Sequence, residues 1–196
     1  VPMVLQKIKE DIIPGLLASY PNISIEFRGQ QRNADKSRKS TLGLTIVALF
    51  IMFMVIALNF NSVSQAFIII LMLPLGFMGA VLGHGIENLP ISILSFIGIV
   101  ALLGILVNDA VVYLDTYNRN LLKGMSVKEA IYSAGISRFR PIVLTSATTV
   151  AGLYPLILEK SFQAQFLIPM ATSVAYGVLF GTFFILLFFP VVVLIM

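Results

Sequence analysis

Charged residues are absent from a long stretch of the chain, residues 40–86. A helix needs about 20 apolar residues to cross about 30 Å of hydrocarbon. The stretch therefore predicts two membrane-spanning helices, at about 41–58 and 66–86. The polar sequence NFNSVSQ at residues 59–65 is the expected turn between them.

Three further apolar runs follow, and they predict spans at about 91–117, 141–158 and 166–196. Residues 118–140 separate the third span from the fourth, and they are polar and basic. They predict a loop with a short amphipathic helix, in which Val127, Ala130, Ile131 and Ala134 recur at helical spacing. Basic loops favour the cytoplasm, so we expect this loop on the cytoplasmic side. Its basic residues are Arg119, Lys123, Lys128, Arg138 and Arg140.

Residues 1–39 have a different pattern. Apolar residues recur at roughly helical spacing from Val4 to Leu16, and the sequence NISIEF at residues 22–27 alternates as a half-buried strand does. One helix and one strand cannot bury a core of their own. The predicted fold class is therefore an all-α polytopic membrane protein with five transmembrane helices and a short α+β remnant at the N-terminus. Residues 40–196 form the transmembrane domain, and we expect the chain to be an internal piece of a longer protein.

Composition supports a membrane protein and narrows the chemistry. The chain is 58% hydrophobic and 11% charged, whereas about a quarter of the residues of a soluble domain are charged. With no Cys and one His, it cannot build a thiolate site or a site with two His ligands. No HExxH or Walker A pattern is present. We therefore expect no cofactor, no metal site and no enzyme, and an ion gradient as the energy source.

Asp109 interrupts the third apolar run directly after Asn108. A charged side chain deep in a span costs about 2.5 to 3.5 kcal/mol, and such residues generally face other helices and serve a function. We expect Asp109 to take up and release a proton during a conformational cycle. The alternative is a structural Asp that pairs with a polar or basic residue across helices.

Arg138 and Thr145 are seven residues apart, which is about two helical turns. If a helix begins at Arg138, both side chains face one way, with Arg138 at the interface and Thr145 deeper. Simple anchoring explains Arg138 equally well, and the Thr145 hydroxyl can instead bond its own backbone. His84 lies at the end of a span beside turn residues, and we expect it to have no functional role.

Small residues allow helices to approach closely in a bilayer. Two GxxxG spacings and two further glycines of the third span are therefore expected at helix contacts. These residues are Gly79, Gly83, Gly98, Gly104, Gly177 and Gly181.

Four segments occur in a specific order along the chain. They are LPLGFMGAVLGH (73–84), LPISILSFIGIVALLGILVNDAVVYLD (89–115), RFRPIVLTSATTVAGLYPL (138–156) and SFQAQFLIPMATSVAYGVLFGT (161–182). Together they resemble the C-terminal half of a bacterial resistance-nodulation-division efflux permease of the hydrophobe/amphiphile multidrug type.

The resemblance implies a full protein of twelve spans in two repeats, of which this chain holds spans eight to twelve. Residues 1 to about 35 would end a periplasmic porter subdomain. The resemblance also implies a homotrimer in the inner membrane that exchanges protons for exported compounds. Its partners would be the N-terminal half of the same permease, a periplasmic adaptor, an outer-membrane channel and the lipid bilayer, with no nucleic acid.

The resemblance also assigns a proton relay. Asn108 and Asp109 occupy positions where well-known multidrug members carry Lys and Asn, so this half supplies no intramembrane cation. Asp109 would be the titrating group and Asn108 its hydrogen-bonding neighbour. Thr145 would be a polar gate and Arg138 an electrostatic partner at the cytoplasmic end.

Other functions remain open at this point. Within the superfamily, the alternative is export of metal ions or lipids. Outside it, the alternatives are a membrane scaffold or sensor that transports nothing, and an intramembrane hydrolase. A scaffold predicts that neutralising Asp109 leaves function intact, whereas a hydrolase predicts cleavage that depends on Asp109.

Overall fold

The structure, a computed structural model, describes residues 13–14 and 30–195, with the side chains of residues 43–194. The strand predicted at 22–27, and most of the helix predicted before it, lie outside the described residues. The chain divides into two compact units, Val1–Ser37 and Arg38–Met196.

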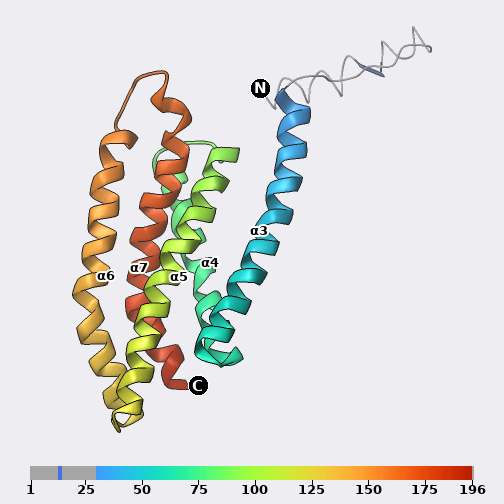
Figure 1. The fold of residues 1–196 in the computed structure, drawn as a ribbon. Helices are drawn as coiled ribbons and strands as arrows, with labels where there is room; N and C mark the ends of the chain where they lie inside the picture. The colour runs from blue at the N-terminus through green and yellow to red at the C-terminus, as the bar shows by residue number, and fades with distance from the viewer. Residues whose placement is uncertain (1–12, 15–29, 196) are drawn as a thin grey trace. The chain divides into compact units, whose positions relative to one another are not determined.

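The described residues form long helices and no strand (Figure 1). The elements are α3 (Gln30–Phe60), α4 (Val63–Ile86), α5 (Ile93–Leu122), α6 (Val127–Ile157), the 3-10 helix η2 (Ala164–Phe166) and α7 (Ile168–Ile195). Within the described part of the chain, four helices are long and apolar enough to cross a membrane, namely Gly43–Phe60 within α3, Val63–Ile86, Ile93–Leu122 and Ile168–Leu194. The chain is therefore a helical polytopic membrane protein.

The fourth predicted span, 141–158, falls in the second half of α6, and α6 is not among these four helices. Its hydroxyl residues Thr145, Ser146, Thr148 and Thr149 lower the hydropathy of this half, and so do Arg140 just before it and the prolines Pro141 and Pro155 within it. Helix length and composition therefore do not establish a count of five spans.

The connection between α5 and α6 differs from the loop predicted at 118–140. Helix α5 continues to Leu122 and α6 begins at Val127, so residues 123–126 alone join them. The expected short amphipathic helix and the expected fourth span form one helix of 31 residues. Gly124, with φ +86, follows the end of α5. Ser126 starts α6 through a capping box with Glu129. Backbone stop signals, rather than the change from apolar to charged residues, set these helix ends.

Helix α7 packs against α4, α5 and α6 (Figure 1). The largest fully buried side chains include Leu102, Leu106 and Tyr113 of α5 and Ile185 and Phe189 of α7. The rings of Tyr113 and Phe189 meet edge to face with their centroids 5.2 Å apart, an arrangement that aromatic pairs prefer. The core therefore lies where α7 meets α4 and α5.

The helices alternate in direction from α4 to α6, so the bundle has two ends (Figure 1). One end, called here the His84 end, holds the end of α4 and the starts of α5 and α7. The other end, called here the Lys128 end, holds the connection of α5 to α6 and the last turns of α7.

Glycines permit the close approach of α7 to its neighbours. A Cβ at Gly79 or Gly83 would collide with Tyr176 or Phe180, and a Cβ at Gly177 or Gly181 with Leu102 or Leu106. A Cβ at Gly98 would lie 2.6 Å from the carbonyl oxygen of Met170.

Gly104 differs from the expectation. It is exposed, and a Cβ there meets nothing within 4 Å among the described residues. The spacing of small residues places Gly104 on α5 but cannot show which side of α5 a neighbouring helix covers.

Candidate functional site

Asp109 lies in the interior of the bundle. It shares the buried face of α5 with Leu106, Ala110 and Tyr113, and its side chain is 5% exposed. Its Oδ2 atom has no hydrogen-bond partner among the described residues. A buried carboxylate is costly when ionised without a partner. The site therefore suits a group that holds a proton in one state and is charged in another.

Asn108 points away from this interior. It is exposed, although Asp109 beside it is buried. Successive residues of a helix differ by about 100° in direction, so the two polar side chains serve different surfaces. Asp109 faces the interior of this bundle, and Asn108 faces its outer surface.

Arg138 is held against α5, away from Asp109. Its Nε donates a hydrogen bond of 2.7 Å to the hydroxyl oxygen of Thr116. Thr116 in turn donates to the carbonyl oxygen of Val112, at 2.9 Å. Thr116 follows Asp109 by seven residues, about 10 Å along the helix. The arginine is thus fixed about two turns closer to the Lys128 end than the carboxylate.

Thr145 is exposed, and its hydroxyl donates to the carbonyl oxygen of Ile142 at 2.9 Å. Among the described residues, no hydrogen bond or ion pair joins Asp109 to Arg138 or Thr145. The structure therefore places Arg138 of α6 against α5, the helix that carries Asp109. It does not bring the four predicted residues into contact with one another.

A different pair of hydroxyls bridges the bundle near Asp109. The hydroxyl oxygens of Ser146 on α6 and Thr182 on α7 are 2.5 Å apart and buried. Thr182 follows Gly181, which lies against Leu106, so the pair is within about one helical turn of the level of Asp109. In the sequence, the many hydroxyl residues of 141–158 indicate that some of them, such as Ser146, face another helix. The sequence analysis did not single out Thr182, because one Thr in a long apolar run is a weaker signal.

His84 is a structural contact that the sequence did not predict. It is 3% exposed, and its Nε2 lies 2.9 Å from the hydroxyl oxygen of Ser173 on α7. Ser173 gives its one proton to the carbonyl oxygen of Pro169, at 3.0 Å. The imidazole Nε2–H is therefore the donor to Ser173, and Nδ1 is left buried without a partner among the described residues.

Tyr176 adds a second link at the same end of the bundle. It lies against Gly83, and its hydroxyl donates a 2.6 Å hydrogen bond to the carboxylate of Glu87. The absence of a side chain at Gly83 makes room for the tyrosine ring. These contacts tie the end of α4 to the beginning of α7.

Comparison with known proteins places this arrangement in a family. Residues 9–196 match the AcrB/AcrD/AcrF family. The chain is 30% identical over 171 residues to multidrug resistance protein MdtC of Erwinia amylovora, covering 87% of this chain and 17% of that protein. It is 31% identical over 173 residues to swarming motility protein SwrC of Bacillus subtilis, covering 87% of this chain and 16% of that protein. The chain thus spans about one sixth of the length of these curated relatives.

A solved structure shares the fold. The crystal structure of a heavy metal efflux pump superimposes with a TM-score of 0.78 at 22% identity, and the match covers 96% of this chain and 19% of that one. On the extent of the family match, the chain belongs to the AcrB/AcrD/AcrF family, within the resistance-nodulation-division permeases.

Proposed function

We propose that the chain is part of the transmembrane domain of an efflux permease that exchanges protons for exported amphiphilic compounds. The observation that carries the proposal is the Asp109 carboxylate, which is buried in a span and leaves Oδ2 unpartnered among the described residues. An ionisable group at such a position typically belongs to an ion pathway or a proton relay. The similarity to a protein named for multidrug resistance supports this reading.

The proposed relay uses the four residues in different ways. Asp109 binds and releases the proton. Asn108, exposed on the adjacent face, meets the N-terminal half of the permease. Arg138, held by Thr116, sets the positive potential at the cytoplasmic end. Thr145 exchanges its bond to Ile142 for a partner from the other half when the helices rock.

The proposed assembly follows the family. Helix α6 supplies the fourth of five spans, and residues 1–39 end a periplasmic porter subdomain. The whole protein is a homotrimer in a bacterial inner membrane, and it works with a periplasmic adaptor and an outer-membrane channel. It carries out no covalent chemistry, and the proton gradient drives it.

Export of metal ions is the second candidate, because the fold matches that of a heavy metal efflux pump. Among the described residues, no three or more His, Cys, Asp or Glu side chains lie together. An amphiphile is the substrate class proposed, on the likeness to a protein named for multidrug resistance. Transport assays with a fluorescent amphiphile and with a soft metal ion, run on the same vesicles, decide between the two.

The decisive experiment is Asp109→Asn in the full-length protein. Asp115→Asn is the matched control, because Asp115 lies on the same helix but is partly exposed and pairs with Arg119 at 3.0 Å. We expect Asp109→Asn to abolish proton-driven efflux of the amphiphile from everted vesicles while trimer assembly is unchanged. The control should transport like the wild type.

Normal transport by Asp109→Asn would overturn the role of the carboxylate. Replacing the proton gradient with a sodium gradient tests the coupling ion. Efflux driven equally well by sodium alone would contradict proton coupling.

A further inference from the structure

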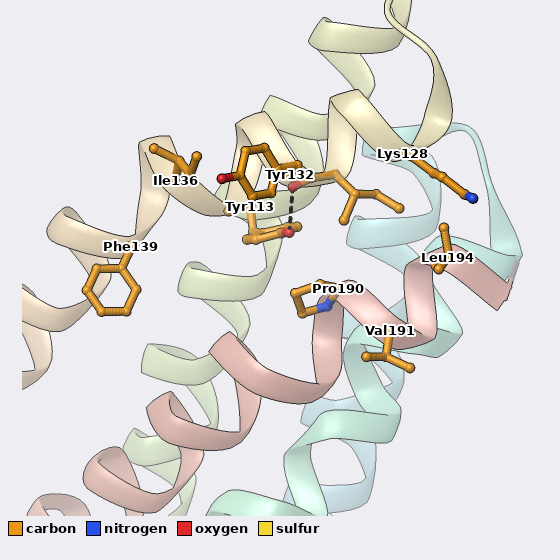
Figure 2. Close-up of a pocket in the computed structure, with 10 residues that line it drawn as sticks. Tyr113, Lys128, Tyr132, Ile136, Phe139, Pro190, Val191 and Leu194 are labelled. Atoms are coloured by element: carbon orange, nitrogen blue, oxygen red, sulfur yellow. Dashed lines mark hydrogen bonds between the residues drawn. The ribbon is translucent and has the colours of Figure 1, made fainter.

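A groove of about 560 Å³ opens at the Lys128 end of the bundle, between the first turns of α6 and the last turns of α7 (Figure 2). Its volume falls in the range of sites that hold small ligands. Tyr113 of α5 lies at its inner side, and Pro190, Val191 and Leu194 of α7 form one wall.

The other wall is a stripe along α6. Lys128, Tyr132, Ile136 and Phe139 recur at intervals of four, four and three residues, which places them on one helix face (Figure 2). Lys128 is outermost, and the apolar residues follow toward the middle of the bundle over about 16 Å. The groove therefore has a charged mouth and an apolar interior.

The groove interior is mostly apolar. Gly135 contributes no side chain, and the Tyr113 hydroxyl is already used because it donates to the carbonyl oxygen of Ile131 at 3.0 Å. The exposed large apolar residues along the groove include Ile136, Phe139 and Val191. Apart from the exposed Tyr132 hydroxyl, the lining between Lys128 and Phe139 is apolar, so a hydrocarbon chain would bury apolar area along it.

The Lys128 ammonium group at the mouth makes no ion pair in the described part of the chain. No acidic side chain of the described residues lies within 4 Å of the Lys128 ammonium group. The neighbouring Glu129 carboxylate is occupied, because it accepts hydrogen bonds from the backbone N–H and the hydroxyl of Ser126, at 3.1 and 2.8 Å. Lys128 also lies in the first turn of α6, where the helix dipole disfavours a cation and favours an anion.

We propose that this groove binds an anionic glycerophospholipid, with one acyl chain along the α6–α7 wall and the phosphate at Lys128. The order of the groups fits a lipid at the edge of a bilayer, because the charge faces water and the apolar stripe runs inward. Basic pockets at the cytoplasmic ends of membrane helices select anionic headgroups in this way. The proposal does not depend on which compound the permease exports.

The test is photo-crosslinking of the full-length protein in vesicles. Two probes carry the same diazirine in one acyl chain, a phosphatidylglycerol and a phosphatidylcholine, and mass spectrometry locates the labelled residues. We expect the phosphatidylglycerol probe to label Tyr132, Ile136 or Phe139 severalfold more than the phosphatidylcholine probe does. Lys128→Gln should remove that excess, and Lys123→Gln, an exposed residue outside the groove, should keep it.

A second variant tests occupancy without changing charge. Ile136→Trp places a large ring in the groove from an exposed position and should lower labelling by both probes. Equal labelling of the wild type by both probes would overturn the proposal, since it would indicate unselective boundary lipid. So would the absence of groove labelling while exposed Leu71 of α4 is labelled, which would indicate that another part of the protein covers the groove.

Discussion

The imidazole of His84 donates a 2.9 Å hydrogen bond to the hydroxyl of Ser173, and this bond joins the last turn of α4 to the first turns of α7. Both side chains are buried. The two residues are 89 positions apart in the chain. The contact therefore fixes two distant segments of the transmembrane domain to each other.

Removing either side chain should lower the stability of the protein, and removing both should lower it by less than the sum of the two single losses. The coupling energy is expected near 0.6 kcal/mol, the average for hydrogen bonds between membrane helices. The measurement is a double-mutant cycle with His84→Ala and Ser173→Ala, followed by thermal unfolding of the solubilised full-length protein. Strictly additive losses would show that the pair is not coupled.

The Ser146–Thr182 bridge should be needed for stability in a way that exposed hydroxyls are not. Thr182→Val keeps the side-chain shape but removes the hydroxyl, so it leaves Ser146 buried without its partner. We expect a clear fall in the midpoint of thermal unfolding. Thr148→Val is the control, because Thr148 is exposed and its hydroxyl bonds only carbonyl oxygens of its own helix. Similar effects of the two substitutions would contradict a special role for the bridge.

Two glycines of the same bundle should differ in how well they tolerate replacement by a large side chain. Gly177 faces Leu102 across the α5–α7 seam, so Gly177→Leu overpacks the core, at a cost of about 1 to 3 kcal/mol or more. Gly152→Leu adds a side chain at an exposed position of α6 where nothing lies within 4 Å among the described residues. The yield of monodisperse protein after detergent extraction should fall for Gly177→Leu and stay near the wild-type level for Gly152→Leu. Equal losses in both variants would contradict a special role for the close approach at Gly177.

The start of α6 should be sensitive to acid. Hydrogen bonds from the Ser126 hydroxyl and backbone lower the pKa of Glu129 below its usual range. A carboxylate with a depressed pKa stabilises the fold above its unfolded-state pKa, and the effect is lost as the pH falls through the folded-state pKa. Hydrogen exchange of the first turn of α6 should therefore speed up, relative to Ser126→Ala at the same pH, as the medium is acidified. An unchanged ratio between the two proteins would show that the capping box has no influence.

The positions of the apolar helices could be read from the sequence because avoidance of charge over about 20 residues is a strong constraint in a bilayer. The ends of the helices were harder. The third span was predicted to end at about residue 117, with Arg119 in the loop that follows, yet α5 continues to Leu122. The ion pair between Asp115 and Arg119 lies along the helix surface, and charges on a surface do not stop a helix.

The direction in which each polar residue faces could be predicted only in part. Asp109 was expected to face other helices because an ionised carboxylate in lipid is costly, and the structure places it in the interior. No comparable penalty orients Asn108 or Thr145. A helix that is apolar on every side carries little signal for its rotation. Only the contacts with α7 decide that Ser146 faces inward and Thr145 outward.

The position of α7 has a consequence for how such a sequence can change over generations. Because α7 touches α4, α5 and α6, a different side-chain size at Gly177 or Phe189 must be matched on another helix before the bundle closes again. Viable substitutions in α7 therefore arise as coordinated sets. Single substitutions are tolerated more readily on the outer face of α6, where a new side chain contacts no other helix of the described part. Among variants of this protein that still assemble, α7 should be the helix whose residues vary together.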